Sequence, residues 1–199
     1  MNKLISPYKN LVQFTKIQLQ PYQLNSDIEL NMETVLKQKV EDKCNKYGFI
    51  DKVYNIQKYS NGILKRENLS GCIDYDITYE CKICLPIEDT VIICRLAAIN
   101  QELIMGTNGP IVVFIPKTNI ESNIWNISST FTHKKTNKEL QKDTLVKVLI
   151  NKVKINQNDK QIKCIGTLLE EPNQEEIDAY YYSNIDTSND IINNDNFII

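Results

Sequence analysis

The sequence predicts an α+β fold in two domains, with a small N-terminal domain joined by one long strand to a C-terminal five-stranded β-barrel. The first observation is the segment from Cys72 to Leu85, in which every second residue is apolar. Side chains of a strand alternate between its two faces, so this periodicity predicts one long strand with a buried face. At roughly 3.3 Å per residue it would reach about 45 Å, which is more than one small sheet needs. The second observation is a series of short apolar segments after this strand, with one long polar connection among them.

The N-terminal domain is expected over residues 11–85, after an unstructured lead at residues 1–10. Its first strand is predicted at residues 11–19, before Pro21, and Asn25-Ser26-Asp27 offers helix N-caps. A helix is predicted from Ile28 to about Lys43, because apolar residues recur there at helical spacing: Leu30, Val35, Leu36 and Val40. A strand at residues 47–56 and a turn at Ser60-Asn61-Gly62 follow. This order resembles a truncated ferredoxin-like domain.

The C-terminal domain is expected over residues 86–170. Strands are predicted at residues 91–99, 103–106, 111–115, 145–155 and 161–168. Short strands with one long connection between the third and the fourth are typical of a small Greek-key barrel of the OB kind. From residue 171 to residue 199 the chain is acidic and rich in Asn, which predicts a disordered tail.

Charge is distributed unevenly along the chain. The net charge is −2, but no Lys, Arg or His follows Lys163, and eight Asp or Glu residues lie after position 169. Without those eight negative charges, the preceding residues carry a net charge of +6. A mildly basic body with an acidic tail is compatible with a protein that binds a polyanion, and equally with a plain solvated surface.

No N-terminal segment has the pattern of a signal peptide, and no apolar run approaches the roughly 20 residues of a membrane helix. We therefore expect a soluble intracellular protein with no membrane contact. Its frequent use of Ile and Asn indicates an AT-rich coding genome.

The six cysteines are expected to be reduced, buried thiols, with no metal and no cofactor. Cys81 and Cys84 have the spacing of a metal or redox motif. On a strand, however, they point to opposite faces with Cα atoms about 10 Å apart. A disulfide needs less than about 7 Å, and zinc needs both sulfurs near 2.3 Å from one ion. A helix or a tight turn at this position would restore the interpretation as a thiol enzyme or a zinc module.

Five segments carry a resemblance to a known family. Val40-Glu41-Asp42-Lys43-Cys44-Asn45-Lys46-Tyr47-Gly48-Phe49-Ile50 resembles a segment at the helix end of the family, and residues 62–71 resemble its tip loop. The long strand into Leu85-Pro86 and the segments at 110–115 and 161–168 resemble three further strands. In this order and spacing, residues 11–171 resemble the larger subunit of the RNA polymerase stalk. This is the seventh subunit of eukaryotic RNA polymerase II and its archaeal counterpart.

The resemblance implies a non-catalytic stalk subunit of a DNA-directed RNA polymerase. In the family, the tip domain wedges into the core enzyme near the base of the clamp, and the barrel lies near the exiting transcript. The implied partners are the largest polymerase subunits, a smaller stalk subunit and weakly bound nascent RNA. The implied location is the nucleus for a cellular protein. The coding bias suits a large DNA virus of protists as well as an AT-rich protist, and for a virus the implied location is the host cytoplasm and the virion.

The resemblance also implies two sets of contact residues. Carried over by position, the polymerase contacts are Lys46, Tyr47, Gly48, Gly62, Ile63 and Leu64. The candidate RNA contacts are Arg95, Lys117, His133, Lys134, Lys135 and Lys147, while Phe114 is expected in the core. The family has a Gly-Phe pair between its first two barrel strands, whereas this chain has Asn100-Gln101-Glu102-Leu103. The missing aromatic residue and the added acid weaken the case for base stacking on the barrel.

The sequence offers no catalytic residues. His133 is the only histidine, its neighbours are lysines, and no carboxylate, Ser or Cys is placed to act with it. No Gly-rich phosphate loop is present. A free-standing RNA-binding factor with an OB fold remains the alternative to a polymerase subunit, although such a factor would not need the N-terminal domain.

Overall fold

The computed structural model describes residues 4–66, 69–127, 131–134, 137 and 139–184. The described chain is mostly β-structure with two α-helices, and it divides into two compact units. The first unit contains Tyr8–Leu85 together with Ile155–Ile162. The second contains the described residues of Met1–Pro7, Pro86–Lys154 and Lys163–Ile199.

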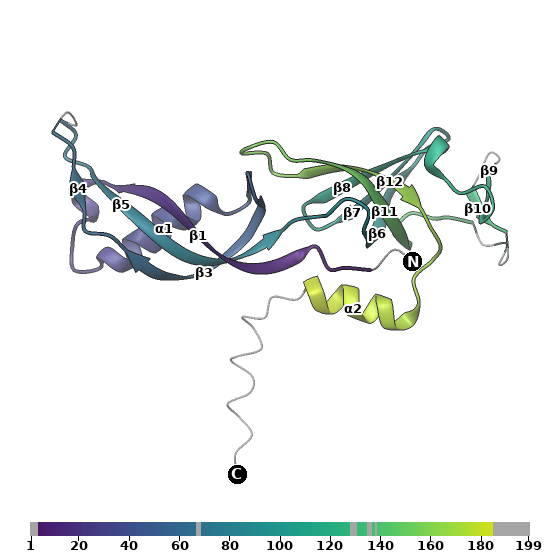
Figure 1. The fold of residues 1–199 in the computed structure, drawn as a ribbon, viewed down its shortest axis with the longest axis horizontal. Helices are drawn as coiled ribbons and strands as arrows, with labels where there is room; N and C mark the ends of the chain where they lie inside the picture. The colour runs from purple at the N-terminus through teal and green to yellow at the C-terminus, as the bar shows by residue number, and fades with distance from the viewer. Residues whose placement is uncertain (1–3, 67–68, 128–130, 135–136, 138, 185–199) are drawn as a thin grey trace, which may run out of the picture. The chain divides into compact units, whose positions relative to one another are not determined.

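The first unit is built on one antiparallel sheet (Figure 1). Its strand order is β1 (Tyr8–Leu19), β5 (Ile73–Cys84), β3 (Gly48–Tyr59) and β2 (Lys43–Asn45). A short strand, β4 (Ile63–Leu64), also pairs with β5. β5 pairs with β1 along its whole length, so the segment with the longest apolar alternation is the centre of the sheet. β1 starts at Tyr8, within the segment expected to be an unstructured lead.

Helix α1 (Ile28–Val40) covers one face of this sheet (Figure 1). Met32 and Leu36 are fully buried and pack against the inward residues of β1 and β5, among them Ile17, Ile77 and Tyr79. Leu30, expected on the buried side, is exposed instead. Met32 takes the buried position, because the helix is turned so that the face through 28, 32, 35 and 36 meets the sheet.

The sheet is strongly coiled. β3 shifts its register against β5 at three places, between Ile50 and Lys52, Val53 and Asn55, and Ile56 and Lys58. Such bulges bend a strand and increase its twist. The two edge strands consequently approach each other, and the Asn45 side chain on β2 donates a 2.8 Å hydrogen bond to Gln13 on β1. The interpretation of this unit as ferredoxin-like stays a prediction.

The second unit contains a closed barrel of five strands. These are β6 (Val91–Ile99), β7 (Leu103–Asn108), β8 (Ile111–Pro116), β11 (Leu145–Lys154) and β12 (Ile162–Leu168). The barrel order is β11-β12-β8-β7-β6. β6 pairs with β11 and so closes the barrel across the long connection. Its interior is apolar, with Ile92, Leu96, Ile104, Val113 and Val146 fully buried or nearly so. A closed five-stranded barrel with this long crossover is compatible with the OB kind.

The long connection contains structure that the sequence did not predict. A two-stranded sheet forms from β9 (Trp125–Ile127) and β10 (Phe131–His133), after a short 3-10 helix, η2 (Lys117–Asn119). Trp125 is 1% exposed, and its indole Nε1 donates a 2.8 Å hydrogen bond to the Leu169 carbonyl. The long polar connection therefore contains a buried and hydrogen-bonded aromatic residue.

Helix α2 (Gln174–Asn184) occupies part of the segment expected to be disordered. Its start is locally encoded, because the Glu176 carboxylate accepts a 2.7 Å hydrogen bond from the Asn173 backbone, as in a capping box. Two acidic residues in the first turn also favour a helix N-terminus. The prediction from charge alone did not take this cap into account. The remainder of the expected tail, residues 185–199, lies outside the described residues.

Candidate functional site

The residues proposed as polymerase contacts fall at opposite ends of the first sheet. Gly48 starts β3, and Phe49 beside it pairs with Cys84. Ile63, in contrast, pairs with Asp74. Ten residues of β5 separate these two positions, which corresponds to about 33 Å along the strand. The structure therefore divides the predicted set into a group at the β4 end of the sheet and a group at the β2 end (Figure 1).

The β4 end exposes several large apolar side chains. Ile63 and Leu64 are 53% and 59% exposed, and Tyr22 and Leu69 are 78% and 99% exposed. β4 pairs with the start of β5, where Ile73 also meets the end of β1. A group of exposed apolar side chains of this kind is typical of a surface that another protein covers.

The glycines in the two groups have roles inside the unit. A Cβ atom on Gly62 would lie 2.5 Å from Cγ2 of Ile73 and 2.8 Å from the ring of Tyr75. Gly48 has φ +137°, and a Cβ atom there would lie 2.6 Å from the Cys84 carbonyl oxygen. Both positions therefore require glycine for close approach to β5, independently of any partner.

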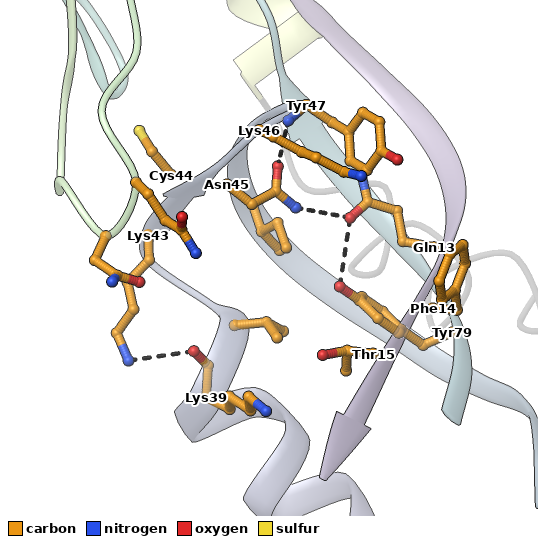
Figure 2. Close-up of a pocket in the computed structure, with 14 residues that line it drawn as sticks. Gln13, Phe14, Thr15, Lys39, Lys43, Cys44, Asn45, Lys46, Tyr47 and Tyr79 are labelled. Carbon is orange, nitrogen blue, oxygen red and sulfur yellow. Dashed lines mark hydrogen bonds between the residues drawn. The ribbon is translucent and has the colours of Figure 1, made fainter. Parts of the chain in front are cut away.

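The β2 end contains a groove of about 290 Å³ between the two edge strands (Figure 2). Residues of β1, the end of α1, β2 and the turn after β11 line it. Three of the lining residues are lysines, Lys39, Lys43 and Lys46, and none of the described lining residues is Asp or Glu. Phe14 and Tyr47 also line the groove and are 81% and 46% exposed.

Hydrogen bonds hold the walls of this groove in place. Asn45 lies at the centre: its amide donates to Gln13, and its Oδ1 accepts a 2.8 Å hydrogen bond from the Tyr47 backbone (Figure 2). Asn158 on the turn donates its backbone N–H to the Cys44 carbonyl at 2.8 Å. The Cys44 N–H donates in return to the Asp159 carbonyl at 2.8 Å, so the turn is hydrogen-bonded to β2. The groove is therefore defined by backbone contacts as well as by side-chain contacts.

The lysines of the groove contact neutral groups. The Lys39 ammonium donates to the Lys16 carbonyl, and the Lys43 ammonium donates to the Gln38 carbonyl at 2.9 Å. The Lys46 ammonium lies 4.6 Å from the centroid of the Tyr47 ring. Sequence reasoning named Lys46 and Tyr47 but missed Lys39 and Lys43. The density of lysines between residues 37 and 46 was the sequence signal that could have indicated these two residues.

The candidate RNA contacts on the second unit do not form one described cluster. Arg95 is exposed on β6, and Lys117 is exposed in η2 with its ammonium 3.9 Å from the Glu102 carboxylate. His133 lies edge-on against Trp125, with ring centroids 5.0 Å apart, and Lys134 beside it is exposed. Lys135 lies outside the described residues. Phe114 on β8 is half-buried opposite Met105 on β7.

The Lys147 side chain on β11 forms ion pairs with helix α2 and with the segment before it. Its side chain is 12% exposed, and its ammonium lies 3.2 Å from carboxylate oxygens of Glu170 and of Glu176. Burial lowers the pKa of Lys147, but the hydrogen bonds to the two carboxylates outweigh burial, so the pKa is raised overall. Within the described chain, this candidate RNA contact is already neutralised.

The six cysteines are buried and none of them forms a disulfide, as expected for reduced thiols. Cys81 and Cys84 lie on β5, so the helix or tight turn that a thiol or zinc site would need is not formed there. Among the described residues, no group of three or more His, Cys, Asp or Glu side chains is placed to hold a metal ion. No helix in the described part of the chain is long and apolar enough to cross a membrane.

Comparison with known proteins identifies a relative of the chain. No protein-family model matches the chain. The chain is 36% identical over 166 residues to a protein of Acanthamoeba polyphaga mimivirus named "Putative DNA-directed RNA polymerase subunit L376". The match covers 83% of this chain and 83% of the mimivirus protein, so it spans both units rather than one shared motif. The chain therefore belongs to the same family as this mimivirus protein, a family of DNA-directed RNA polymerase subunits.

Proposed function

We propose that the chain is a non-catalytic stalk subunit of a DNA-directed RNA polymerase, which docks on the core enzyme through the β4 end of its first sheet. The family supports a role as a polymerase subunit. The exposed apolar group at the β4 end is the observation that carries the docking proposal. Leu69, Tyr22, Leu64 and Ile63 are all more than half exposed, and such a group is best explained by a partner that covers it.

The proposed partners follow from this role. The β4 end contacts the largest polymerase subunits, and a smaller stalk subunit is the second protein partner. The barrel lies near the exiting transcript and contacts it through the exposed basic residues Arg95, Lys117 and Lys134. Such contacts are expected to be weak and to weaken further with salt, since they involve phosphates. Because the relative is a mimivirus protein, the proposed location is the host cytoplasm and the virion.

The test is co-purification of the full-length chain with the polymerase from its native source. Ile63→Ser combined with Leu64→Ser removes apolar surface at the β4 end without adding charge beside Asp74, which pairs with Ile63 on β5. We expect this variant to lose the two largest polymerase subunits, while circular dichroism and the unfolding temperature stay near those of the wild type. A matched control, Ile87→Ser with Ile165→Ser, removes exposed apolar residues from the second unit and is expected to retain them.

Undiminished recovery of the largest subunits by the β4-end variant would contradict docking through this surface. Recovery of ribosomal or general RNA-binding proteins by the wild type, without polymerase subunits, would instead favour the free-standing RNA-binding factor.

A further inference from the structure

We propose that the groove between β1 and β2 binds single-stranded nucleic acid, through phosphates held by three lysines and a base stacked on exposed aromatic residues. This site lies at the end of the sheet opposite to the proposed docking surface. It assigns Lys46 and Tyr47 to a nucleic-acid ligand rather than to the polymerase core. The inference goes beyond the proposed stalk function and does not depend on it.

The first argument is charge. Lys39, Lys43 and Lys46 line one cavity, and its described lining contains no carboxylate. These ammonium groups contact backbone carbonyls and the Tyr47 ring. A carbonyl accepts a hydrogen bond from an ammonium group, and an aromatic ring attracts it, but neither cancels the positive charge of the ammonium group. The groove therefore keeps a positive potential that suits a chain of phosphates.

Two acidic side chains near the groove, those of Asp159 and Glu41, form hydrogen bonds outside its lining. The Asp159 carboxylate accepts a 2.8 Å hydrogen bond from the Asn156 side chain, and Asp159 is absent from the residues that line the groove. The Glu41 carboxylate at the end of α1 accepts a 2.7 Å hydrogen bond from the Val53 backbone. Neither residue lines the groove, although the Asp159 carboxylate, after burial, helps to raise the pKa of Cys44, which does line it.

The second argument is the obstruction of strand addition. A long edge strand such as β1 is in general open to pairing with an extended polypeptide. Here the Lys16 carbonyl of β1 already accepts a hydrogen bond from the Lys39 ammonium. The Gln13 and Asn45 side chains are hydrogen-bonded to each other across the gap between the two edges. Lysine on an edge is a known means of blocking strand pairing, so these contacts favour a ligand that meets side chains over an added strand.

The third argument is the presence of aromatic surface beside the lysines. Phe14 is 81% exposed although it lies on the central part of β1, and Tyr47 is 46% exposed with the Lys46 ammonium above its ring. Aromatic side chains beside a positively charged groove are the common means of holding single-stranded bases without sequence preference. The amides of Gln157 and Asn158, which also line the groove, supply groups that can hydrogen-bond to base edges.

The test is fluorescence anisotropy of the full-length chain with labelled twelve-nucleotide oligouridine and oligothymidine, from low to moderate salt. The groove variant is Lys39→Gln with Lys43→Gln and Lys46→Gln. We expect it to bind at least tenfold more weakly. We also expect the slope of log affinity against log salt to fall by about two, at about 0.7 for each single-strand phosphate that a lysine no longer neutralises. RNA and DNA are both measured, because their phosphates and base faces are shared chemistry.

Three further variants make the result specific. Lys58→Gln with Lys142→Gln and Lys163→Gln removes three exposed lysines elsewhere and is expected to change affinity less than threefold. Replacing the three groove lysines with arginine keeps the charge and is expected to retain binding, which excludes misfolding as the cause of a loss. Phe14→Ser is expected to weaken binding about tenfold while leaving the salt slope unchanged, because it removes a stacking surface and no charge.

Several outcomes would overturn the proposal. These are no binding by the wild type at low salt, an equal loss in the control lysine variant, or unchanged affinity in Phe14→Ser. Tighter binding of a twelve-residue polyglutamate peptide than of either oligonucleotide would assign the groove to an acidic polypeptide instead. Nucleic-acid binding carried only by the barrel would survive in the groove variant, since that variant leaves the barrel unchanged. Failure of docking at the β4 end would leave these measurements unaffected.

Discussion

The ammonium of Lys147 lies 3.2 Å from the Glu176 carboxylate, and this contact joins barrel strand β11 to helix α2. The same carboxylate accepts the backbone N–H of Asn173, so one side chain both starts the helix and neutralises a barrel lysine. Glu170 adds a second carboxylate to Lys147 at 3.2 Å. The acidic segment after the barrel thus has a defined electrostatic partner on the barrel itself.

Glu170→Gln with Glu176→Gln is expected to free Lys147 and loosen α2. The change removes the charge of both partners while keeping their size, so the ion pairs are lost and the helix loses its capping carboxylate. A loss of about 1 kcal/mol in the local stability of α2 is expected for pairs of this exposure together with a weakened cap. Hydrogen exchange should then be faster over residues 174–184. If the barrel contacts RNA, affinity for oligouridine should rise because Lys147 becomes available.

The control for this prediction is Glu175→Gln with Asp178→Asn, which removes two charges from the same helix. Neither residue forms an ion pair with Lys147 in the described structure, and both are exposed. Equal acceleration of exchange in the control would show that net charge, rather than the contact with Lys147, orders the helix.

The long alternating segments were predictable from sequence because their periodicity is local. β5 falls within the segment from Cys72 to Leu85, and the five barrel strands lie close to the predicted ranges. Residues that face the core repeat every second position in such strands, and this signal needs no knowledge of the partner strand. The burial of Cys81 follows from the same pattern, whereas Cys84 lies on the opposite face of β5 and is buried as well.

The groove could not be predicted, because it depends on contacts between distant segments. Gln13 and Asn45 meet only because the bulges of β3 bring opposite edges of the sheet together. Asn158 reaches β2 from the turn between two barrel strands, more than 100 residues further along the chain. The exposure of Leu30 was missed for a related reason, since apolar spacing on a helix does not fix which side meets the sheet.

Gly48→Ala is expected to destabilise the first unit by about 2 kcal/mol or more. The added Cβ would lie 2.6 Å from the Cys84 carbonyl oxygen, and the backbone has φ +137°, which L-residues rarely adopt. Because the obstacle is backbone of the central strand, it has little freedom to move. Hydrogen exchange of β5 measures the change within this unit. It is preferable to fluorescence, since the single tryptophan, Trp125, lies in the other unit.

Gly109→Ala provides the comparison for Gly48. Gly109 lies in the turn between β7 and β8 at φ +54°, in the left-handed region that costs an L-residue about 1 kcal/mol. We therefore expect a smaller effect, confined to exchange in the barrel. Equal effects of the two substitutions would show that the contact with Cys84 is relieved by local movement.

Asp74 is expected to make the first unit sensitive to acid. Its carboxylate accepts a hydrogen bond from Lys65 at 2.7 Å, which is the main cause of its lowered pKa, and the Gln18 amide donates at 3.1 Å. A carboxyl with a lowered folded pKa contributes stability that is complete above its usual value of 3.8. This stability is lost as the pH falls through the lower folded value. We therefore expect the first unit to unfold when the pH falls below the folded pKa of Asp74.

Lys65→Met tests the contribution of the lysine. It removes the main cause of the shift, so the pKa of Asp74 should rise and the acid-unfolding midpoint should move to higher pH. Carboxyl carbon NMR measures the pKa directly. Lys16→Met removes the partner of the exposed pair with Asp76 and only the smallest of the contributions that lower the pKa of Asp74, so it should move the midpoint less than Lys65→Met does. An unchanged Asp74 pKa in Lys65→Met would contradict the assignment.

The thiols are expected to be unreactive in the folded protein at pH 8. Burial, with Glu80 nearby, raises the pKa of Cys81 to about 11, and burial, with Glu88 nearby, raises that of Cys164 to about 12. Burial also raises the pKa of Cys94, so the thiolate that attacks a disulfide reagent is scarce at these positions. Titration with a chromogenic disulfide at pH 8 should detect all six thiols only after addition of guanidinium, because unfolding restores ordinary pKa values and access.

Rapid reaction of any thiol in the native protein would show that its segment opens, and the labelled position would say where. Since the backbone of Cys44 is hydrogen-bonded to the turn that lines the groove, faster labelling there than at Cys94 or Cys164 would locate that opening at the groove.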